Sequence, residues 1–279
     1  MKIDAHQHFW HYVPEDFGWI DDQMRALQRD FLPGDLKGEI QAAGVDGVVT
    51  VQARQCVEET DWLLDLAQDN DFIRGVVGWV PLVSSEVEAV LERVAGAPQL
   101  VGARHVLHDE PDEDYMLRAD FNDGVGLLQE YGLAYDVLIF ERHLPQAVAF
   151  VDRHPEQVFV LDHIAKPRIA EGALEPWKTR VEELAEREHC YCKLSGLVTE
   201  ADWNAWTPAD LRPYWDTVLE AFGPERLMFG SDWPVCRLAC DYSRWLRTIE
   251  RLIAPPSDAE RNRLLGGTAE EAYQLTARA

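Results

Sequence analysis

The chain has 279 residues, of which 47% are hydrophobic and 27% charged, a composition typical of a folded globular protein. Its 26 basic and 50 acidic residues give a net charge of −24, which argues against nucleic acid and anionic membranes as partners because both bind basic surfaces. No uninterrupted apolar run of about 18 residues and no basic-then-apolar leader is present, and five cysteines suit a reducing compartment, so we expect a cytoplasmic protein.

The first segment carries two histidines on one face of a predicted strand. Residues 2–8 alternate in polarity, so side chains two positions apart point the same way, and His6 and His8 lie side by side. Two such imidazoles can hold a metal ion or handle protons. The alternative is an edge strand with two surface histidines. The residues around the two histidines are apolar, and the segment at residues 228–234, at the end of another predicted strand, also carries polar residues. Both observations favour a functional site over surface histidines.

Apolar runs recur along the chain at regular intervals. Most are rich in Val, Ile and Leu and lack polar alternation, as expected for parallel strands buried on both faces. The predicted strands span residues 3–9, 45–52, 73–81, 101–107, 133–140, 158–164, 190–197 and 227–233.

Segments with helical spacing lie between these runs. They cover residues 59–68, 85–95, 121–131, 142–154, 174–188, 210–222 and 242–253. Ser84, Asn122 and Thr207 are predicted helix caps, and Gly44 and Gly223 are predicted helix ends.

Eight strands alternating with helices predict a single-domain (β/α)8 TIM barrel over residues 1–279. A doubly wound open sheet is the alternative, but residues 9–12 lack the Gly-rich turn that usually follows its first strand. Residues 10–33 are predicted to form a long loop over the barrel mouth.

Polar residues gather at the predicted strand ends, where such barrels carry their chemistry. Charged groups inside apolar strands are costly to bury unless they are paired. Arg104 could be a structural ion-pair partner of Asp136 or Asp162, and Lys193 a lysine at the edge of the core. Packing explains less well why four polar residues occur together at the ends of predicted strands. These residues are His6, His8, His163 and Asp232.

Three segments together resemble the amidohydrolase superfamily, and more narrowly its sugar-lactonase and pyrone-dicarboxylate hydrolase branch. They are residues 4–10 (DAHQHFW), 162–167 (DHIAKP) and 229–234 (FGSDWP). The resemblance extends from residue 2 to about residue 276. It implies a (β/α)8 barrel that hydrolyses a bond at a carbonyl group, with the catalytic centre at the histidines and the aspartate just named.

The chain departs from the two-metal members of that superfamily. Those members use a carboxylated lysine on strand four or a histidine at the end of strand five. Strand four here has Arg104 and His105, and strand five has Asp136, so a binuclear centre is not expected. What remains is one divalent ion held by some of His6, His8, His163 and Asp232, with zinc favoured, or a centre that needs no metal.

Lactone hydrolysis needs a water nucleophile, a base, charge stabilisation at the carbonyl oxygen and a proton for the leaving alkoxide. Asp232 is the predicted base, and a metal on His6 and His8, or protonated histidines directly, would polarise the carbonyl. His163 would form a hydrogen bond to the carbonyl or hold the water. The predicted substrate-binding residues are Arg104, Gln52, Asp136 and Lys166, together with Trp10, Trp79 and Trp233 as stacking faces.

The leading hypothesis is therefore an enzyme that opens a fucono-, galactono- or rhamnono-lactone to the sugar acid. Pyrone-dicarboxylate hydrolysis or metal-dependent decarboxylation is the second hypothesis, since Arg54, Arg104, Lys166 and Lys193 could bind a dicarboxylate. A non-catalytic binding barrel is the third, and it predicts that the strand-end residues fail to converge. A small molecule is the expected partner, and the oligomeric state stays open, a homodimer included.

Overall fold

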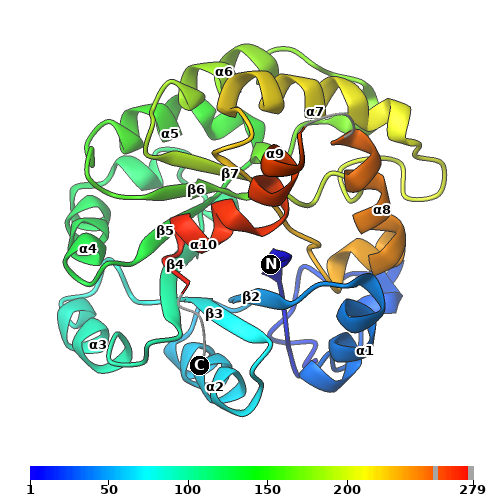
Figure 1. The fold of residues 1–279 in the computed structure, drawn as a ribbon. Coiled ribbons are helices and arrows are strands. Elements are labelled where there is room, and N and C mark those ends of the chain that lie inside the picture. The colour runs from blue at the N-terminus through cyan, green and yellow to red at the C-terminus, as the bar shows by residue number, and fades with distance from the viewer. Residues whose placement is uncertain (254–256, 276–279) are drawn as a thin grey trace.

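A computed structural model describes residues 1–253 and 257–275. Over these residues eight parallel strands pair in chain order, each with the next, and confirm the predicted barrel (Figure 1). A parallel bridge between Gln7 and Trp233 joins the first strand to the segment after the last one. The strands are β1 (Ile3–Gln7), β2 (Gly47–Val51), β3 (Ile73–Gly78), β4 (Leu100–Val106), β5 (Ala134–Leu138), β6 (Phe159–Leu161), β7 (Cys190–Leu194) and β8 (Leu227–Phe229). The predicted domain range ends at residue 279, and residues 276–279 lie outside the described part.

Helices surround the strands on the outside of the ring (Figure 1). They are α1 (Pro33–Ala43), α2 (Val57–Asp69), α3 (Val87–Val94), α4 (Ala119–Glu130), α5 (Leu144–Val151), α6 (Trp177–Ala185), α7 (Pro208–Phe222) and α8 (Tyr242–Leu252). Seven of these overlap a predicted helix, whereas α1 was not predicted. Its sequence opens Pro33-Gly34 and contains Gly38, and glycine inside a helix weakens the local signal.

Two of the predicted caps compare clearly with the helix ends. Thr207 is the N-cap residue of α7 and is followed by a proline in the first turn, as predicted. The Asp210 carboxylate accepts from the Thr207 backbone N–H at 2.7 Å, which was not predicted. Asn122 is not a cap, because α4 already begins at Ala119, and its side-chain amide donates to the carbonyl of Arg118 instead.

Most of the predicted strands run further than the observed ones at their carboxyl ends. The largest difference is at β8, which ends at Phe229 rather than at residue 233. Strand β6 ends at Leu161, after which Asp162–Ala165 form a tight turn. His163 and Ile164 in this turn have φ values of 52° and 48°, in the left-handed region that non-glycine residues seldom adopt. The backbone thus stops pairing with the neighbouring strands at the point where polar residues begin to line the mouth of the barrel.

The long connection after β1 is closed at its base. Trp10 and Phe31 form an antiparallel bridge with two backbone hydrogen bonds of 2.9 Å, and the Trp10 indole donates to the carbonyl of Arg29 at 2.9 Å. Phe17 packs against the Trp10 ring. A short helix, Asp22–Leu27, lies within the connection and contacts the turn Val235–Leu238 that follows β8.

A C-terminal segment closes the end of the barrel at which the strands begin. It consists of α9 (Asp258–Asn262), a π-helical turn (Arg263–Gly267) and α10 (Thr268–Ala272), and α10 lies across the opening (Figure 1). Ala269, Ala272 and Tyr273 pack into the apolar cluster inside the barrel. Neither helix of this segment was predicted.

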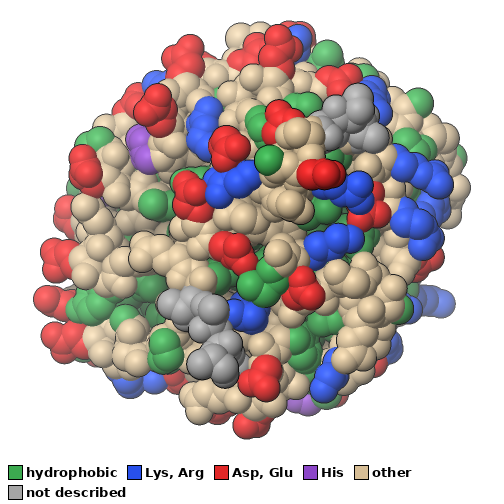
Figure 2. Space-filling view, in the orientation of Figure 1, with side chains coloured by type: hydrophobic (Ala, Val, Ile, Leu, Met, Phe, Trp, Pro, Cys, Tyr) green, Lys and Arg blue, Asp and Glu red, His purple; other side chains and the backbone are tan. Residues whose placement is uncertain are grey.

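The charge of the chain is carried on its surface. Figure 2 shows acidic side chains spread over the visible face with basic ones among them, and no single large patch of either sign. Among the described residues no helix combines the length and apolarity needed to span a bilayer.

Candidate active site

His6 and His8 project from β1 and the residue that follows it, and their rings approach each other closely. The two Nε2 atoms lie 3.2 Å apart, and both residues are buried. The His8 Nδ1 lies 2.8 Å from the carbonyl oxygen of Val51, which can only accept, so Nδ1 carries the proton and the Nε2 of the neutral ring is a free base. The His6 Nδ1 lies 3.2 Å from the Asp162 carboxylate, which orients the His6 Nε2 in the same way.

Burial lowers the pKa of His6 well below its usual value, and the nearby charge of Lys193 lowers it further, although Asp162 opposes both effects. His6 is therefore neutral at pH 7. Two unprotonated Nε2 atoms at 3.2 Å repel each other unless a cation or a proton lies near both.

Asp232 is brought to this pair by the closure of the barrel. Its backbone N–H donates to the carbonyl of His6 at 2.8 Å, and its carboxylate lies 3.5 Å from the His8 Nε2 and 3.9 Å from the His6 Nε2. Its φ of 56° turns the side chain out of the strand direction. Burial alone would raise the pKa of Asp232, but His163, His8 and Lys166 lower it below its usual value. The carboxylate is thus ionised at pH 7.

His163 completes the group from the turn after β6. Its ring centroid lies 4.4 Å from that of His6, and its Nδ1 lies 2.8 Å from the Ser195 hydroxyl. Burial lowers the pKa of His163 well below its usual value, so the ring is neutral and can exchange hydrogen bonds with a polar substrate atom. Gly196 packs against this ring, and a Cβ atom there would lie 2.7 Å from it.

A buried network of charges lies behind His6. Arg104 donates to Asp162 at 2.9 Å and to the Gln52 side chain at 2.9 Å. Lys193 contacts Asp162 at 3.0 Å, forms an ion pair with Asp136, and lies 3.2 Å from the His6 Nδ1. Burial alone would raise the pKa of Asp162, but Lys193, His6 and Arg104 hold it well below its usual value.

The four predicted centre residues therefore converge, which contradicts the hypothesis of a non-catalytic barrel. The residues predicted to bind substrate separate into two groups. Arg104, Gln52 and Asp136 are buried in the network, where Arg104 takes the structural alternative of an ion pair with Asp162. Most of their polar atoms bond within the protein, but the Arg104 Nε and Gln52 Nε2 atoms are buried without a hydrogen-bond partner among the described residues, so direct substrate contacts by these three stay a prediction.

Trp233 is also misassigned as a stacking face, since its ring is fully buried against Phe9 and Phe31 and its indole faces Glu39 of α1. Its place next to Asp232 in the sequence gave no information on which side of the turn it points. Trp79 and Lys166 stay half-buried at the mouth, where they contact His105 and Glu200.

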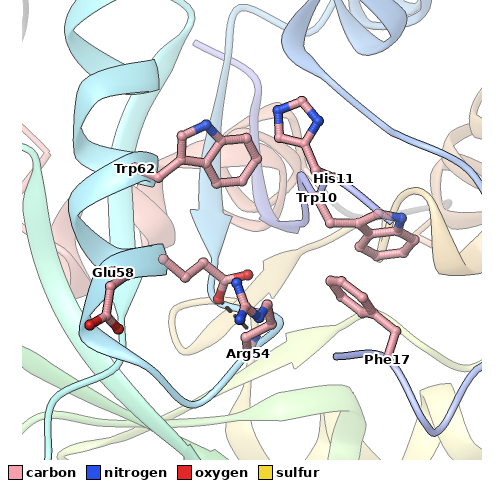
Figure 3. A pocket seen from close by; sticks show the side chains of 7 residues that line it. Trp10, His11, Phe17, Arg54, Glu58 and Trp62 are labelled. Atoms are coloured by element: carbon pink, nitrogen blue, oxygen red, sulfur yellow. Dashed lines mark hydrogen bonds between the residues drawn. The ribbon is translucent and has the colours of Figure 1, made fainter. Parts of the chain in front are cut away.

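Trp10, although almost fully buried, and His11 lie in the wall of a cavity of about 160 Å³ (Figure 3). Phe17, Trp62 and Arg54 form other parts of its wall, and the Trp10 ring centroid lies 6.5 Å from that of His8. Arg54 also borders an open hollow of about 350 Å³, where it pairs with Asp16 at 3.0 Å. Aromatic faces beside a few charged groups suit a polyhydroxylated ring.

The residues present fit a single zinc ion. His6, His8 and Asp232 offer two imidazole nitrogens and a carboxylate oxygen, the ligand types that zinc prefers. Their separations of 3.2, 3.5 and 3.9 Å compare with about 3.3 Å between ligands of a tetrahedral zinc with bonds of about 2.0–2.1 Å. His6, Asp162 and His163 form a second group of this kind. The Nδ1 atoms of His6 and His8 bond to a carboxylate and to a backbone carbonyl, as the second ring nitrogen of a zinc-binding histidine usually does.

Three buried residues that contact His6 were not assigned to the site from the sequence. Asp162 and Lys193 had been noticed at strand ends, but only their contacts with His6 reveal their role. Asp4 accepts from the backbone N–H groups of Ser231 and His6 and from the Tyr242 hydroxyl, and burial raises its pKa to about 6. The sequence signal that could have identified Asp4 is a charged residue within an otherwise apolar, buried strand.

The amidohydrolase family model matches residues 3–275. An L-fucono-1,5-lactonase of Burkholderia multivorans is 46% identical, with 99% of this chain and 96% of that protein aligned. An L-fucono-1,5-lactonase of Burkholderia ambifaria is 40% identical over the same shares. A crystal structure of an amidohydrolase from Burkholderia multivorans with bound zinc superposes with a TM-score of 0.94 at 46% identity, covering 99% of this chain and all of that one.

Proposed function

Because this chain belongs to the amidohydrolase family, we propose that it hydrolyses a sugar-derived lactone, with L-fucono-1,5-lactone as the first candidate substrate. The observation that carries this proposal is the convergence of an ionised carboxylate, Asp232, on three buried histidines at the carboxyl ends of the strands. A hydrolytic centre needs a base and carbonyl-polarising groups within reach of one substrate atom, and this arrangement supplies both.

Asp232 carries the proton in this mechanism. It takes a proton from the water that attacks the lactone carbonyl, and a tetrahedral intermediate forms. When the ring C–O bond breaks, Asp232 returns the proton to the departing ring oxygen, so that one water is consumed and one hydroxy acid is formed. A pKa below the usual range makes Asp232 a weak base, so the water must be acidified where it binds.

His6 and His8, with Asp232 as third ligand, would hold a zinc ion, the metal bound in the superposed Burkholderia structure. The chemistry that zinc supplies in such a site is a polarised carbonyl and a bound water whose pKa falls to about 7. His163, oriented by Ser195, donates or accepts a hydrogen bond at the carbonyl oxygen or the water.

The mouth of the barrel favours a neutral substrate over a dicarboxylate. All four cations that could bind two carboxylates are paired with acidic groups: Arg54 with Asp16, Arg104 with Asp162, Lys166 with Glu200, and Lys193 with Asp136. A pyrone dicarboxylate would have to break such pairs, whereas a neutral sugar lactone needs none of these cations and leaves the pairs intact.

A panel of lactones tests the proposal. Hydrolysis rates are measured for fucono-, galactono- and rhamnono-lactones and for pyrone dicarboxylate, with protein as purified, after chelation, and after zinc is restored. We expect a sugar 1,5-lactone to be the best substrate, with activity lost on chelation and regained with zinc. Preference for the pyrone dicarboxylate over every sugar lactone would contradict the proposal.

A further inference from the structure

The open hollow of about 350 Å³ lies between the connections that follow three of the strands. Asp16 and Trp19 belong to the connection after β1, Arg54 to the turn after β2, and Val106 and Asp109 to the end of β4 and the turn after it. All three strands end at the side of the barrel that carries the catalytic centre. The volume lies within the range of small-molecule sites in proteins, about 300–1,000 Å³.

The hollow begins a short distance beyond the catalytic centre along β4. The Arg104 side chain reaches the centre, because its Nη1 lies 3.4 Å from the His6 Nε2. Val106, in the wall of the hollow, lies two residues further along the same strand. Two strand residues advance the backbone by about 7 Å, and their side chains share a face. A ligand held at the centre by one end therefore brings its other end to the hollow.

Two tryptophan rings connect the hollow with the centre by a second path. The Trp10 ring centroid lies 6.5 Å from that of His8 and 6.1 Å from that of Trp19, and the two indoles are nearly perpendicular. Trp10 is almost fully buried, whereas Trp19 keeps 42% of its surface exposed in the wall of the hollow. An indole that is fixed by a perpendicular contact and otherwise open offers a flat apolar face to a sugar ring.

The polar groups of the hollow suit hydroxyls better than a carboxylate. Arg54 forms an ion pair with Asp16 at 3.0 Å. A sugar hydroxyl can accept from the guanidinium and donate to the carboxylate at the same time, so it binds without separating the pair. Glu15 and Asp109 add carboxylates to the same wall, and these repel an anionic ligand.

We propose that this hollow is the subsite for the hydroxylated end of the lactone substrate, the end away from the reacting carbonyl, with Trp19 as its stacking face. The inference deepens the proposed function, on which its kinetic readout rests. It assigns specificity for a polyhydroxylated ring to the connection after β1, whereas the reaction itself stays with the histidines and Asp232.

Both the chain and the substrate offer matched controls. Val13 is exposed on the same connection, with 44% of its surface accessible, and does not line the hollow. Trp19→Phe keeps an aromatic face at the subsite, whereas Trp19→Ala removes it. The unsubstituted six-membered lactone, δ-valerolactone, carries the reacting ester without any hydroxyl group, so its turnover does not depend on the subsite.

The experiment measures kcat and KM of each variant, per folded molecule, for the best sugar lactone of the panel and for δ-valerolactone. We expect Trp19→Ala to raise KM for the sugar lactone about tenfold and to change kcat less than about twofold, because the stacking face binds the substrate and its transition state alike. Trp19→Phe should raise this KM less than about threefold, because it keeps a ring. Val13→Ala should leave it unchanged, and no variant should alter the turnover of δ-valerolactone.

Three outcomes contradict the inference. Equal KM values for the sugar lactone in Trp19→Ala and Val13→Ala would overturn it. So would an equal loss on both lactones, because Trp19 would then support the catalytic centre rather than a subsite. A loss in Trp19→Phe as large as that in Trp19→Ala would exclude a stacking face.

A titration separates this inference from the proposed function. The probe is L-fucose, a neutral sugar ring with hydroxyl groups but no ester to hydrolyse. NMR records the indole N–H signal of Trp19, assigned by its absence in Trp19→Phe. We expect the signal to shift as the sugar is added and to reach saturation. If no lactone of the panel is hydrolysed, the proposed function alone fails, whereas an unmoved Trp19 signal over the whole range of sugar solubility would overturn the inference.

Discussion

Asp232 is the residue on which the proposed reaction depends most directly. Asp232→Asn keeps the shape of the side chain but removes its ability to carry a proton. We expect kcat to fall at least about a hundredfold, in line with typical general acid–base contributions, while the melting temperature changes little. Asp65→Asn, which removes an exposed carboxylate from α2, is the control for lost charge and should leave kcat unchanged. Near-normal turnover by Asp232→Asn would remove this residue from the mechanism.

Gly196 allows His163 to occupy its place. Its φ is +70°, and a Cβ there would meet the His163 ring at 2.7 Å. Gly132 has a similar φ of +67° with no atom within 4 Å of its Cβ position. Both alanine variants should lose about 1 kcal/mol or more of stability through left-handed backbone strain. Only Gly196→Ala should also lower kcat, by about tenfold or more, because His163 must move. Equal kcat in the two variants would contradict this explanation.

Glu59, in the wall of the cavity that Trp10 also lines, should make stability depend on pH. Burial raises its pKa from 4.5 to about 7, against the opposing hydrogen bonds from the backbone of Arg54 and Ala53. A raised pKa means that the folded state binds the proton more tightly, so this contribution is fully present below about pH 4.5 and is lost as the pH rises to about 7.

The loss corresponds to about 3 kcal/mol at about 1.4 kcal/mol per pKa unit. Thermal unfolding between pH 4.5 and pH 7.5 should therefore show a smaller decrease in stability for Glu59→Gln than for the unaltered chain. Parallel curves for the two proteins would show that Glu59 does not titrate in this range.

At the scale of the elements, the packing of α4 depends on one close backbone approach. A Cβ at Gly124 would lie 2.0 Å from the carbonyl oxygen of Leu82, in the connection between β3 and α3. A Cβ at Gly126, in the same helix, would meet nothing within 4 Å. Gly126→Ala should stabilise the protein by about 0.5–1 kcal/mol through helix propensity. Gly124→Ala should destabilise it by about 2 kcal/mol or more, because backbone must shift.

Chemical unfolding of the two glycine variants measures the difference. Stabilisation by both alanines would mean that α4 can move away from Leu82 at no cost.

For the whole molecule, a net charge of −24 implies repulsion among surface carboxylates. Figure 2 shows these groups distributed over the visible face. Salt screens such repulsion over a length of about 10 Å at 0.1 M and about 3 Å at 1 M. We expect the melting temperature to rise by several degrees between low salt and 1 M NaCl at pH 7.5. The rise should be equal in KCl and smaller at about pH 5, where carboxylates begin to protonate. A melting temperature that falls with salt would contradict this expectation.

The order of strands and helices, and the end of the barrel that carries the site, could be inferred from the chain alone. Hydrophobic periodicity is local: it shows that residues 45–52 form a buried strand and that His6 and His8 share a face. The rule that barrel chemistry lies at strand carboxyl ends then brings His163 and Asp232 to the same place. These inferences needed only the spacing of residues within each element.

Contacts between distant elements were decided by the tertiary structure. Arg104 pairs with Asp162 rather than with Asp136, although the strand register puts Arg104 opposite Asp136, and Lys193 pairs with Asp136; the directions of the side chains inside the closed barrel decide these partners. Trp233 turns toward α1 rather than toward the mouth for the same kind of reason. Tyr273 shows this most clearly, because its hydroxyl donates to Asp136, 137 positions earlier, and no local pattern links the two residues. The burial of Tyr273 and its hydrogen bond become possible only when all the strands have closed around the barrel interior.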